Sequence, residues 1–291
     1  MNTLAVKSAQ LAGGPLLPYA EAGRPEGIPV VLVHGVGDSW WTFEPLLRQL
    51  PAALHAFAPT QRGHGDAERP EDGYLPEDFA RDLVLFLDAV GIDRAVLVGA
   101  SSGGVPARMV AGSHPDRVAG LVLMGVPATL DDKPGAARLW ETVRELRDPV
   151  PRSFVEDLLG GMVARPVGRG LMATMTEECL KPPARVWRET LRGLLETDLA
   201  ATLRGILVPT LLLWGDQDAY LPRADQQVVL DSILGSTLVV HEGSGHLLYW
   251  EQPERVVQDL AGFAVRVMPP GPSGGVPPDG GRPGSGGPDS G

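Results

Sequence analysis

The sequence predicts an α/β fold in which helices cover both faces of a mostly parallel, doubly wound sheet. Short, continuous apolar runs alternate along the chain with segments whose apolar residues recur at helical spacing. A continuous apolar run is typical of a strand covered on both faces, and its alternation with helices is typical of a doubly wound sheet. The chain of 291 residues is long enough to bury such a core.

The expected strands and helices alternate along most of the chain. Residues 11–22 mix glycine, proline and apolar residues and could supply one or two antiparallel edge strands. Continuous apolar runs predict further strands over residues 28–33, 54–58, 95–98, 118–124, 210–214 and 237–240. The spacing of apolar residues predicts amphipathic helices from Pro76 to Gly91, over 222–234 and over 253–267.

The alternation of strands and helices stops between residues 127 and 204, where no strand-like run occurs. Proline and glycine separate four helical patterns there, over residues 136–147, 154–162, 171–180 and 184–199. We predict a helical lid inserted after the sixth strand, so that the core consists of residues 1–126 and 205–267. Some of the lid's large apolar side chains should pack within it and others should face a pocket; they are Trp140, Phe154, Met162, Met172, Met175 and Trp187.

Composition narrows the function classes. The net charge of −11 argues against nucleic acid or an anionic membrane as a partner, since both would repel an acidic surface. The single cysteine, Cys179, excludes an intrachain disulfide and a multi-cysteine metal site, and its thiol is expected to be buried. We expect a cytoplasmic protein without a signal peptide, cofactor or metal, acting on a small molecule. Residues 268–291 are rich in proline, glycine and serine and are expected to form a disordered tail.

A strand, a sharp turn and a helix are predicted around the segment Gly99-Ala100-Ser101-Ser102-Gly103-Gly104. Such a turn can hold a serine exposed beside a base, and the start of the helix offers N–H groups to an oxyanion. Glycines are needed where the two backbones approach closely. Ser101 is the preferred nucleophile because it leaves glycine at the tightest position, and Ser102 is the alternative in the neighbouring register.

Two further apolar strands end in turns that carry an acid and a histidine. The first turn contains Asp216 and Asp218, and the second leads to His246. Because parallel strands present their carboxyl ends at one edge of a sheet, we expect Ser101, Asp218 and His246 to converge there. A histidine can take the serine proton, and a buried carboxylate can orient that histidine.

Other polar residues have simpler interpretations. His64, in a loop between two glycines, is expected to be structural. His241 lies inside a strand pattern, where a hydrogen-bonded sheet histidine is the expected reading. Gly35 and Gly37 lack the third glycine of a dinucleotide loop, so a better use of this turn is a backbone N–H, from Val36, that points into the site.

These motifs together resemble the α/β-hydrolase superfamily over residues 11–267. The resemblance is carried by five motifs, which are His34-Gly35, Arg62-Gly63-His64-Gly65, the segment 99–104, Gly215-Asp216-Gln217-Asp218 with Pro222, and Gly245-His246.

The resemblance implies the α/β-hydrolase fold with Ser101 as nucleophile, His246 as general base and acid, and Asp218 as orienting acid. The family's glycine-to-acid spacing favours Asp218 over Asp216. Backbone N–H groups of Val36 and Ser102 would form the oxyanion hole. The dehalogenase and epoxide-hydrolase branches of the family have aspartate at the position of Ser101. The serine of this sequence therefore argues against those two reactions.

A serine hydrolase that cleaves a carboxylic ester or lactone through an acyl-enzyme is therefore expected, on a small and largely apolar substrate. On the same three residues, perhydrolysis of the haloperoxidase kind and hydrolysis of a carbon–carbon bond remain alternatives. A ligand-binding or signalling protein with little turnover is the alternative from a different class.

Overall fold

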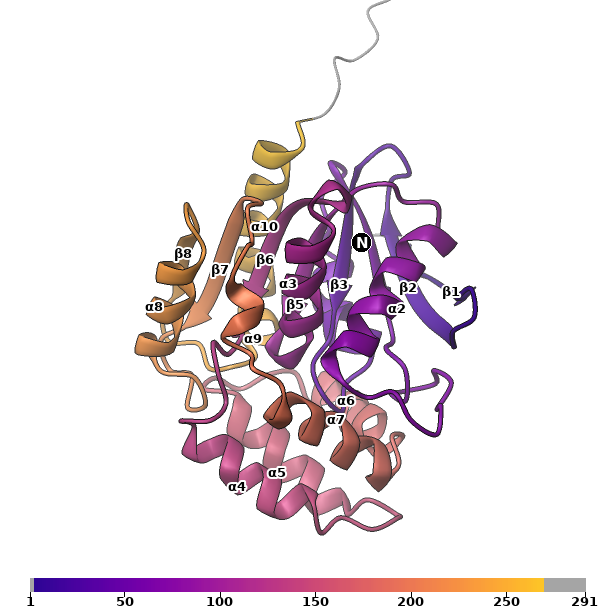
Figure 1. The fold of residues 1–291 in the computed structure, drawn as a ribbon, viewed down its shortest axis with the longest axis vertical. Coiled ribbons are helices and arrows are strands. Elements are labelled where there is room, and N and C mark those ends of the chain that lie inside the picture. The colour runs from indigo at the N-terminus through magenta and orange to yellow at the C-terminus, as the bar shows by residue number, and fades with distance from the viewer. Residues whose placement is uncertain (1–2, 270–291) are drawn as a thin grey trace, which may run out of the picture.

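The computed structural model describes residues 3–269, which form an eight-stranded sheet flanked by helices (Figure 1). The strand order is β1-β2-β4-β3-β5-β6-β7-β8. Strand β2 runs antiparallel to its neighbours β1 and β4, and the other neighbouring pairs are parallel. The strands are β1 (Ala5–Gln10), β2 (Leu16–Gly23), β3 (Ile28–Val33), β4 (Leu54–Pro59), β5 (Ala95–Ala100), β6 (Val118–Met124), β7 (Thr210–Gly215) and β8 (Thr237–His241).

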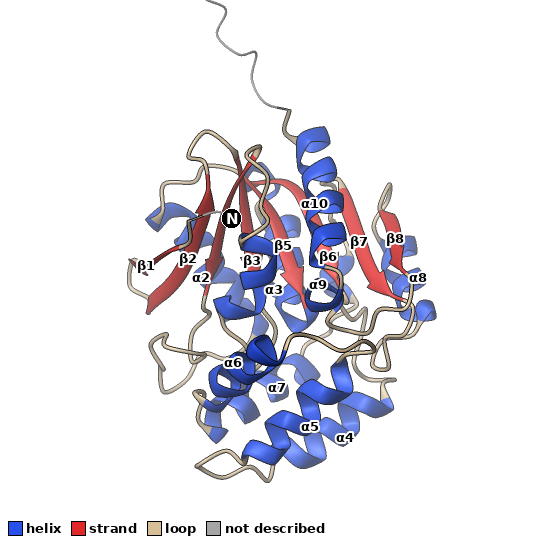
Figure 2. Ribbon diagram, turned by 180° about the vertical axis from the view of Figure 1, so that it is seen from behind, coloured by secondary structure: helices blue, strands red, loops and turns tan. Residues whose placement is uncertain are grey.

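Apolar layers cover both faces of the sheet. In β3, Val30 and Leu32 belong to one layer and Val31 and Val33 to the other, because successive side chains of a strand point to opposite faces. The first layer contains α1 (Glu44–Leu47), α9 (Leu248–Glu251) and α10 (Pro253–Val267), and the second contains α2 (Pro76–Ala89), α3 (Gly104–Ser113) and α8 (Arg223–Ser232). Figure 2 shows α10 on the face opposite to α2 and α3. The continuous apolar runs of the sequence thus correspond to strands covered on both sides.

Four helices lie between β6 and β7 in the chain: α4 (Pro134–Val143), α5 (Arg152–Met162), α6 (Arg169–Leu180) and α7 (Ala184–Glu196). They gather beyond one end of the sheet, at the bottom of Figure 1. Short 3-10 helices complete the fold: η1 (Trp40–Phe43), η2 (Ser101–Gly103), η3 (Pro115–Arg117) and η4 (Ala201–Leu203). Strands β6 and β7, which precede and follow the four helices in the chain, are neighbours in the same sheet.

The expectation for the first strands needs correction. Strand β1 begins at Ala5, ahead of the segment 11–22, and Gly13 in the turn that follows has a left-handed φ of 66°. The sequence of β1, Ala-Val-Lys-Ser-Ala-Gln, contains no continuous apolar run that would indicate a strand. This agrees with its position at the edge of the sheet, where only Ala9 of the strand is buried. The tail expected over residues 268–291 lies, from residue 270 onward, outside the described residues. Within residues 3–269, no helix has the length and apolarity needed to cross a bilayer.

Candidate active site

Ser101 lies in the turn between β5 and α3, and its backbone has a φ of 50°. It is the one residue other than glycine with a positive φ among residues 3–269. A Cβ on Gly99 would lie 2.3 Å from the Cα of Gly104, and one on Gly103 would lie 2.2 Å from the carbonyl oxygen of His34. The small residues around Ser101 thus allow strand and helix to approach closely enough to hold its hydroxyl in this strained turn.

The side chains of Ser101, His246 and Asp218 form one hydrogen-bonded chain. His246 Nε2 lies 2.9 Å from Ser101 Oγ, and His246 Nδ1 lies 2.8 Å from Asp218 Oδ2. Asp218 Oδ1 accepts the backbone N–H groups of Tyr220 and Leu221 at 2.8 and 3.0 Å. The turns after β5, β7 and β8 therefore bring these three side chains together at one edge of the sheet, where the sequence predicted that they converge.

Electrostatics favour charge separation within this chain. Burial by itself would raise the pKa of Asp218, but the charge and hydrogen bond of His246 and two backbone N–H groups hold that pKa below its usual value. For His246 burial has the opposite effect and by itself would lower the pKa. The Asp218 carboxylate more than offsets this, so that the pKa of His246 is raised. The imidazole is thus prepared to accept a proton and to be stabilised as an imidazolium.

The alternative residues lie elsewhere. Asp216 Oδ1 accepts the N–H of Gly243 at 2.6 Å, and His241 Nε2 lies 3.1 Å from Asp259 Oδ2. His64 is buried, and its Nδ1–H donates to the carbonyl oxygen of Arg62 at 2.8 Å. None of these three side chains takes part in the hydrogen-bonded chain of Ser101.

Ser102, the alternative nucleophile, has a different position. Its Oγ accepts the backbone N–H of Val36 at 2.8 Å, while Ser101 Oγ faces His246. The sequence indicated the backbone N–H groups of Val36 and Ser102 as a pair of donors, but it gave no signal that the Ser102 hydroxyl contacts one of them. A substrate oxygen that uses the Val36 N–H therefore has to replace this hydroxyl.

A cavity of about 80 Å³, called here the main cavity, opens beside Ser101 and His246. Of the six large apolar side chains expected either to pack within the lid or to face a pocket, Met162 lines this cavity, whereas Met175 and Trp187 are buried in the core. Tyr220 also lines it, with its ring centroid 5.6 Å from that of His246. Most of the remaining lining is apolar and comes from Val36, Pro127, Leu130, Ala136, Leu139, Leu191, Leu194 and Leu221.

The sequence also missed a buried acid close to the site. Asp38 follows the Val36 turn, is 7% exposed, and its Oδ1 accepts the thiol of Cys179 at 3.6 Å. Burial raises the pKa of Asp38 to about 7. Cys179 is itself buried, as its residue type led us to expect. Nothing in the spacing of the sequence marks this aspartate, because an acid in a glycine-rich loop is normally exposed to water.

No cluster of three or more His, Cys, Asp or Glu side chains among residues 3–269 is arranged to hold a metal ion. The reactive groups that meet at this site are a serine hydroxyl, a histidine that can accept its proton, and a carboxylate that orients the histidine.

Comparison with known proteins identifies the family. The α/β hydrolase fold family matches residues 28–253, and the chain belongs to this family. Its relatives include a putative carbamate hydrolase of Variovorax paradoxus, 31% identical over 88% of this chain and 98% of the relative. A non-heme chloroperoxidase of Streptomyces lividans is 30% identical over 84% of this chain and 94% of the relative. A thermophilic esterase from Thermogutta terrifontis has a similar structure, with a TM-score of 0.78 and 25% identity over 90% of this chain and 99% of the esterase. Membership in this family supports hydrolase activity.

Proposed function

We propose that the protein is a serine hydrolase that cleaves a carboxylic ester or lactone of a small, largely apolar substrate through an acyl-enzyme. The observation that carries this proposal is the continuous hydrogen-bonded chain from Asp218 through His246 to Ser101. A serine hydroxyl reacts with a carbonyl when a base takes its proton, and this geometry provides that base within hydrogen-bonding distance.

In the proposed reaction, Ser101 Oγ attacks the carbonyl carbon while its proton passes to His246 Nε2. The negative charge on the carbonyl oxygen is stabilised by the backbone N–H groups of Val36 and Ser102. The imidazolium then gives its proton to the leaving alcohol oxygen as the carbon–oxygen bond breaks. Water, activated by the same imidazole, attacks the acyl-enzyme and releases the carboxylic acid and Ser101.

The lining of the main cavity supports an apolar substrate. In the proposed reaction the carbonyl chemistry takes place at its wall, beside Ser101 and His246, and most of the other lining side chains are apolar. The ammonium group of Lys133, which also lines the cavity, is paired with the carboxylate of Asp225. Such a surface favours an apolar alcohol part by burial and offers few partners to a charged one.

The test is covalent labelling with a fluorophosphonate probe, followed by peptide mapping and by turnover of an activated phenyl ester. Labelling is expected at Ser101, and Ser101→Ala should lower kcat by about 10⁴-fold or more while leaving the urea unfolding curve nearly unchanged. Undiminished turnover in Ser101→Ala would refute the proposal.

The chain offers matched controls for the other two residues. Asp218→Asn should lower kcat strongly, whereas Asp216→Asn in the same turn should have little effect on it, because the Asp216 carboxylate binds the N–H of Gly243. His246→Gln should abolish labelling of Ser101. His241→Gln should leave the labelling intact, because His241 faces Asp259 instead of Ser101. Equal effects of the two aspartate variants would contradict the assignment of Asp218.

A further inference from the structure

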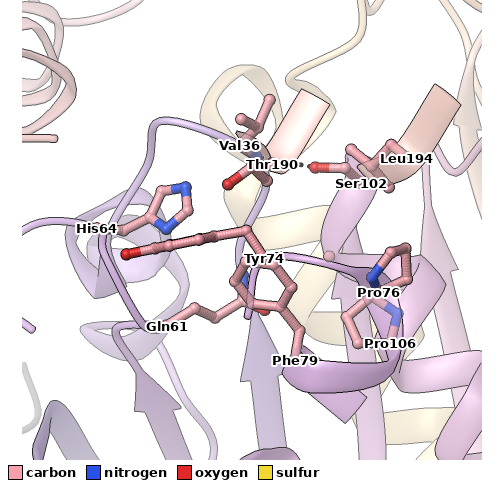
Figure 3. Close-up of a pocket in the computed structure, with 11 residues that line it drawn as sticks. Val36, Gln61, His64, Tyr74, Pro76, Phe79, Ser102, Pro106, Thr190 and Leu194 are labelled. Atoms are coloured by element: carbon pink, nitrogen blue, oxygen red, sulfur yellow. Dashed lines mark hydrogen bonds between the residues drawn. The ribbon is translucent and has the colours of Figure 1, made fainter. Parts of the chain in front are cut away.

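A second, smaller cavity also has Ser102 in its lining, and we call it the side chamber (Figure 3). Its volume is about 20 Å³, and it shares Val36, Ser102 and Leu194 with the lining of the main cavity. Space of this size accommodates a group about as large as one water molecule. The side chamber thus adjoins the proposed oxyanion hole and is large enough for one small substituent.

Two buried polar atoms in the side chamber lack a partner. His64 and Thr190 line it and are 1% and 5% exposed, and neither His64 Nε2 nor Thr190 Oγ1 has a hydrogen-bond partner among residues 3–269. They come from different parts of the fold, since His64 lies in the loop after β4 and Thr190 in α7 (Figure 3). A buried polar atom without a partner costs free energy, so a group that pairs with both is favoured here.

The hydrogen-bonding roles of these two atoms follow from their surroundings. Since His64 Nδ1 faces the carbonyl oxygen of Arg62, the proton of the neutral ring resides on Nδ1 and Nε2 is an acceptor. Burial lowers the pKa of His64 to about 4, so the ring is neutral near pH 7. The Thr190 hydroxyl can donate or accept. A hydroxyl group suits this pair, because it can donate to His64 Nε2 and accept from Thr190 at the same time.

The position of His246 indicates which half of an ester reaches the side chamber. The leaving alcohol must lie near His246 Nε2, which protonates it, and His246 lines the main cavity and not the side chamber. The oxyanion uses the N–H groups of Val36 and Ser102, and Val36 and Ser102 also line the side chamber. The remaining substituent of the carbonyl carbon, which is the acyl chain, is therefore the one that can enter it.

We propose that the side chamber is an acyl subsite for the hydroxyl of a short 2-hydroxyacyl ester, with His64 Nε2 as acceptor and Thr190 Oγ1 as donor. This rests on the proposed ester hydrolysis at Ser101 and specifies its substrate class. A methyl group of equal size leaves both polar atoms unpaired, and a carboxylate cannot donate to His64. A short chain is required because the chamber has room for little beyond the hydroxyl.

The experiment compares phenyl hydroxyacetate with phenyl propanoate, which differ by the exchange of a hydroxyl for a methyl group. The ratio of their kcat/KM values is measured for the wild-type protein and for Thr190→Val, which keeps the shape of the side chain and removes its hydroxyl. The two esters differ in intrinsic reactivity, but this difference is the same for every variant and cancels. We expect the ratio to fall about tenfold in Thr190→Val, the effect of one buried hydrogen bond.

Two further variants make the result specific. Thr190→Ser keeps the hydroxyl and should keep the ratio within about twofold of the wild-type value. Thr197→Val removes a hydroxyl from the end of the same helix, where it bonds the carbonyl oxygen of Gly193, and should not change the ratio. Urea unfolding checks that each variant is folded, and Thr190→Ala replaces Thr190→Val if the latter does not fold.

The outcomes separate this subsite from the proposed function. Ser101-dependent turnover with the same ratio in the wild-type protein and in Thr190→Val would overturn the subsite and leave ester hydrolysis in place, with the side chamber holding a water molecule only. Absence of Ser101-dependent turnover of both phenyl esters would overturn the proposed function, and the acyl subsite with it.

Discussion

Replacing the buried Asp38 by asparagine should make the protein more stable at alkaline pH relative to acid pH. Asp38 is 7% exposed and contacts the thiol of Cys179, so its charged form is poorly solvated. Burial raises its pKa from 3.8 to about 7, although its interactions with Cys179, Thr42 and His246 work in the opposite direction. Asparagine keeps the shape and the carbonyl oxygen and does not titrate.

The magnitude follows from the linkage between protonation and folding. Below about pH 4 the carboxyl is protonated in both the folded and the unfolded chain, and it contributes no pH dependence. Between about pH 4 and pH 7 the unfolded chain releases the proton while the folded protein keeps it, so the free energy of unfolding decreases as pH rises. A pKa difference of about 3 units, at about 1.4 kcal/mol per unit, corresponds to about 4 kcal/mol, after which the dependence levels off.

The assay is urea unfolding of the wild-type protein and of Asp38→Asn at several values between about pH 4 and pH 8. The difference in free energy of unfolding, variant minus wild type, should increase by about 4 kcal/mol across this range. The exposed Asp93 provides a control, since Asp93→Asn removes a carboxylate from the surface and its difference should stay nearly constant. A constant difference for Asp38→Asn as well would refute the argument, because Asp38 would then titrate as it does in the unfolded chain.

Three other changes have defined outcomes. Ser102→Ala frees the N–H of Val36 for the oxyanion, so kcat/KM for phenyl propanoate should rise by about threefold to tenfold; a decrease would mean that the hydroxyl itself donates to the oxyanion. Gly103→Ala brings a Cβ to 2.2 Å from a backbone carbonyl oxygen and should destabilise the fold by about 3 kcal/mol or more in urea, whereas Gly112→Ala, with nothing nearer than 3.9 Å, should not destabilise it. The Asp218 carboxylate raises the pKa of His246 above 6.5 despite burial. Because the protonated imidazole cannot act as the base, kcat/KM should decline toward acid pH with a midpoint above 6.5. A midpoint below that value would contradict this electrostatic account.

The positions of the three candidate residues could be predicted from the sequence because they depend on where strands end. Continuous apolar runs locate β5, β7 and β8, and the first polar turn after each run carries Ser101, Asp218 or, slightly later, His246. Parallel pairing then requires these turns to lie at the same edge. The last helix was predicted equally well, over residues 253–267, since its apolar face repeats at helical spacing.

Features that depend on the direction of a single loop side chain could not be predicted. Asp38 is buried, and its carboxylate contacts the thiol of Cys179 in α6, which is distant from it in the chain. Thr190 belongs to a helix whose existence was expected, but which of its faces meets His64 depends on how α7 packs beyond the sheet. Periodicity identifies the buried face of a helix and gives no information on which polar atoms are left without partners there.

Ser102 connects the chemistry of the site with its proposed acyl selectivity. Its hydroxyl accepts the N–H of Val36, and Ser102 lines both the main cavity and the side chamber. Because every ester needs the same oxyanion contact, Ser102→Ala should change the turnover of phenyl hydroxyacetate and phenyl propanoate in the same direction. Thr190→Val, by contrast, should change their ratio, since its hydroxyl acts on one acyl group only. If the two variants had the same pattern of effects, the oxyanion hole and the side chamber would not be separate parts of the site.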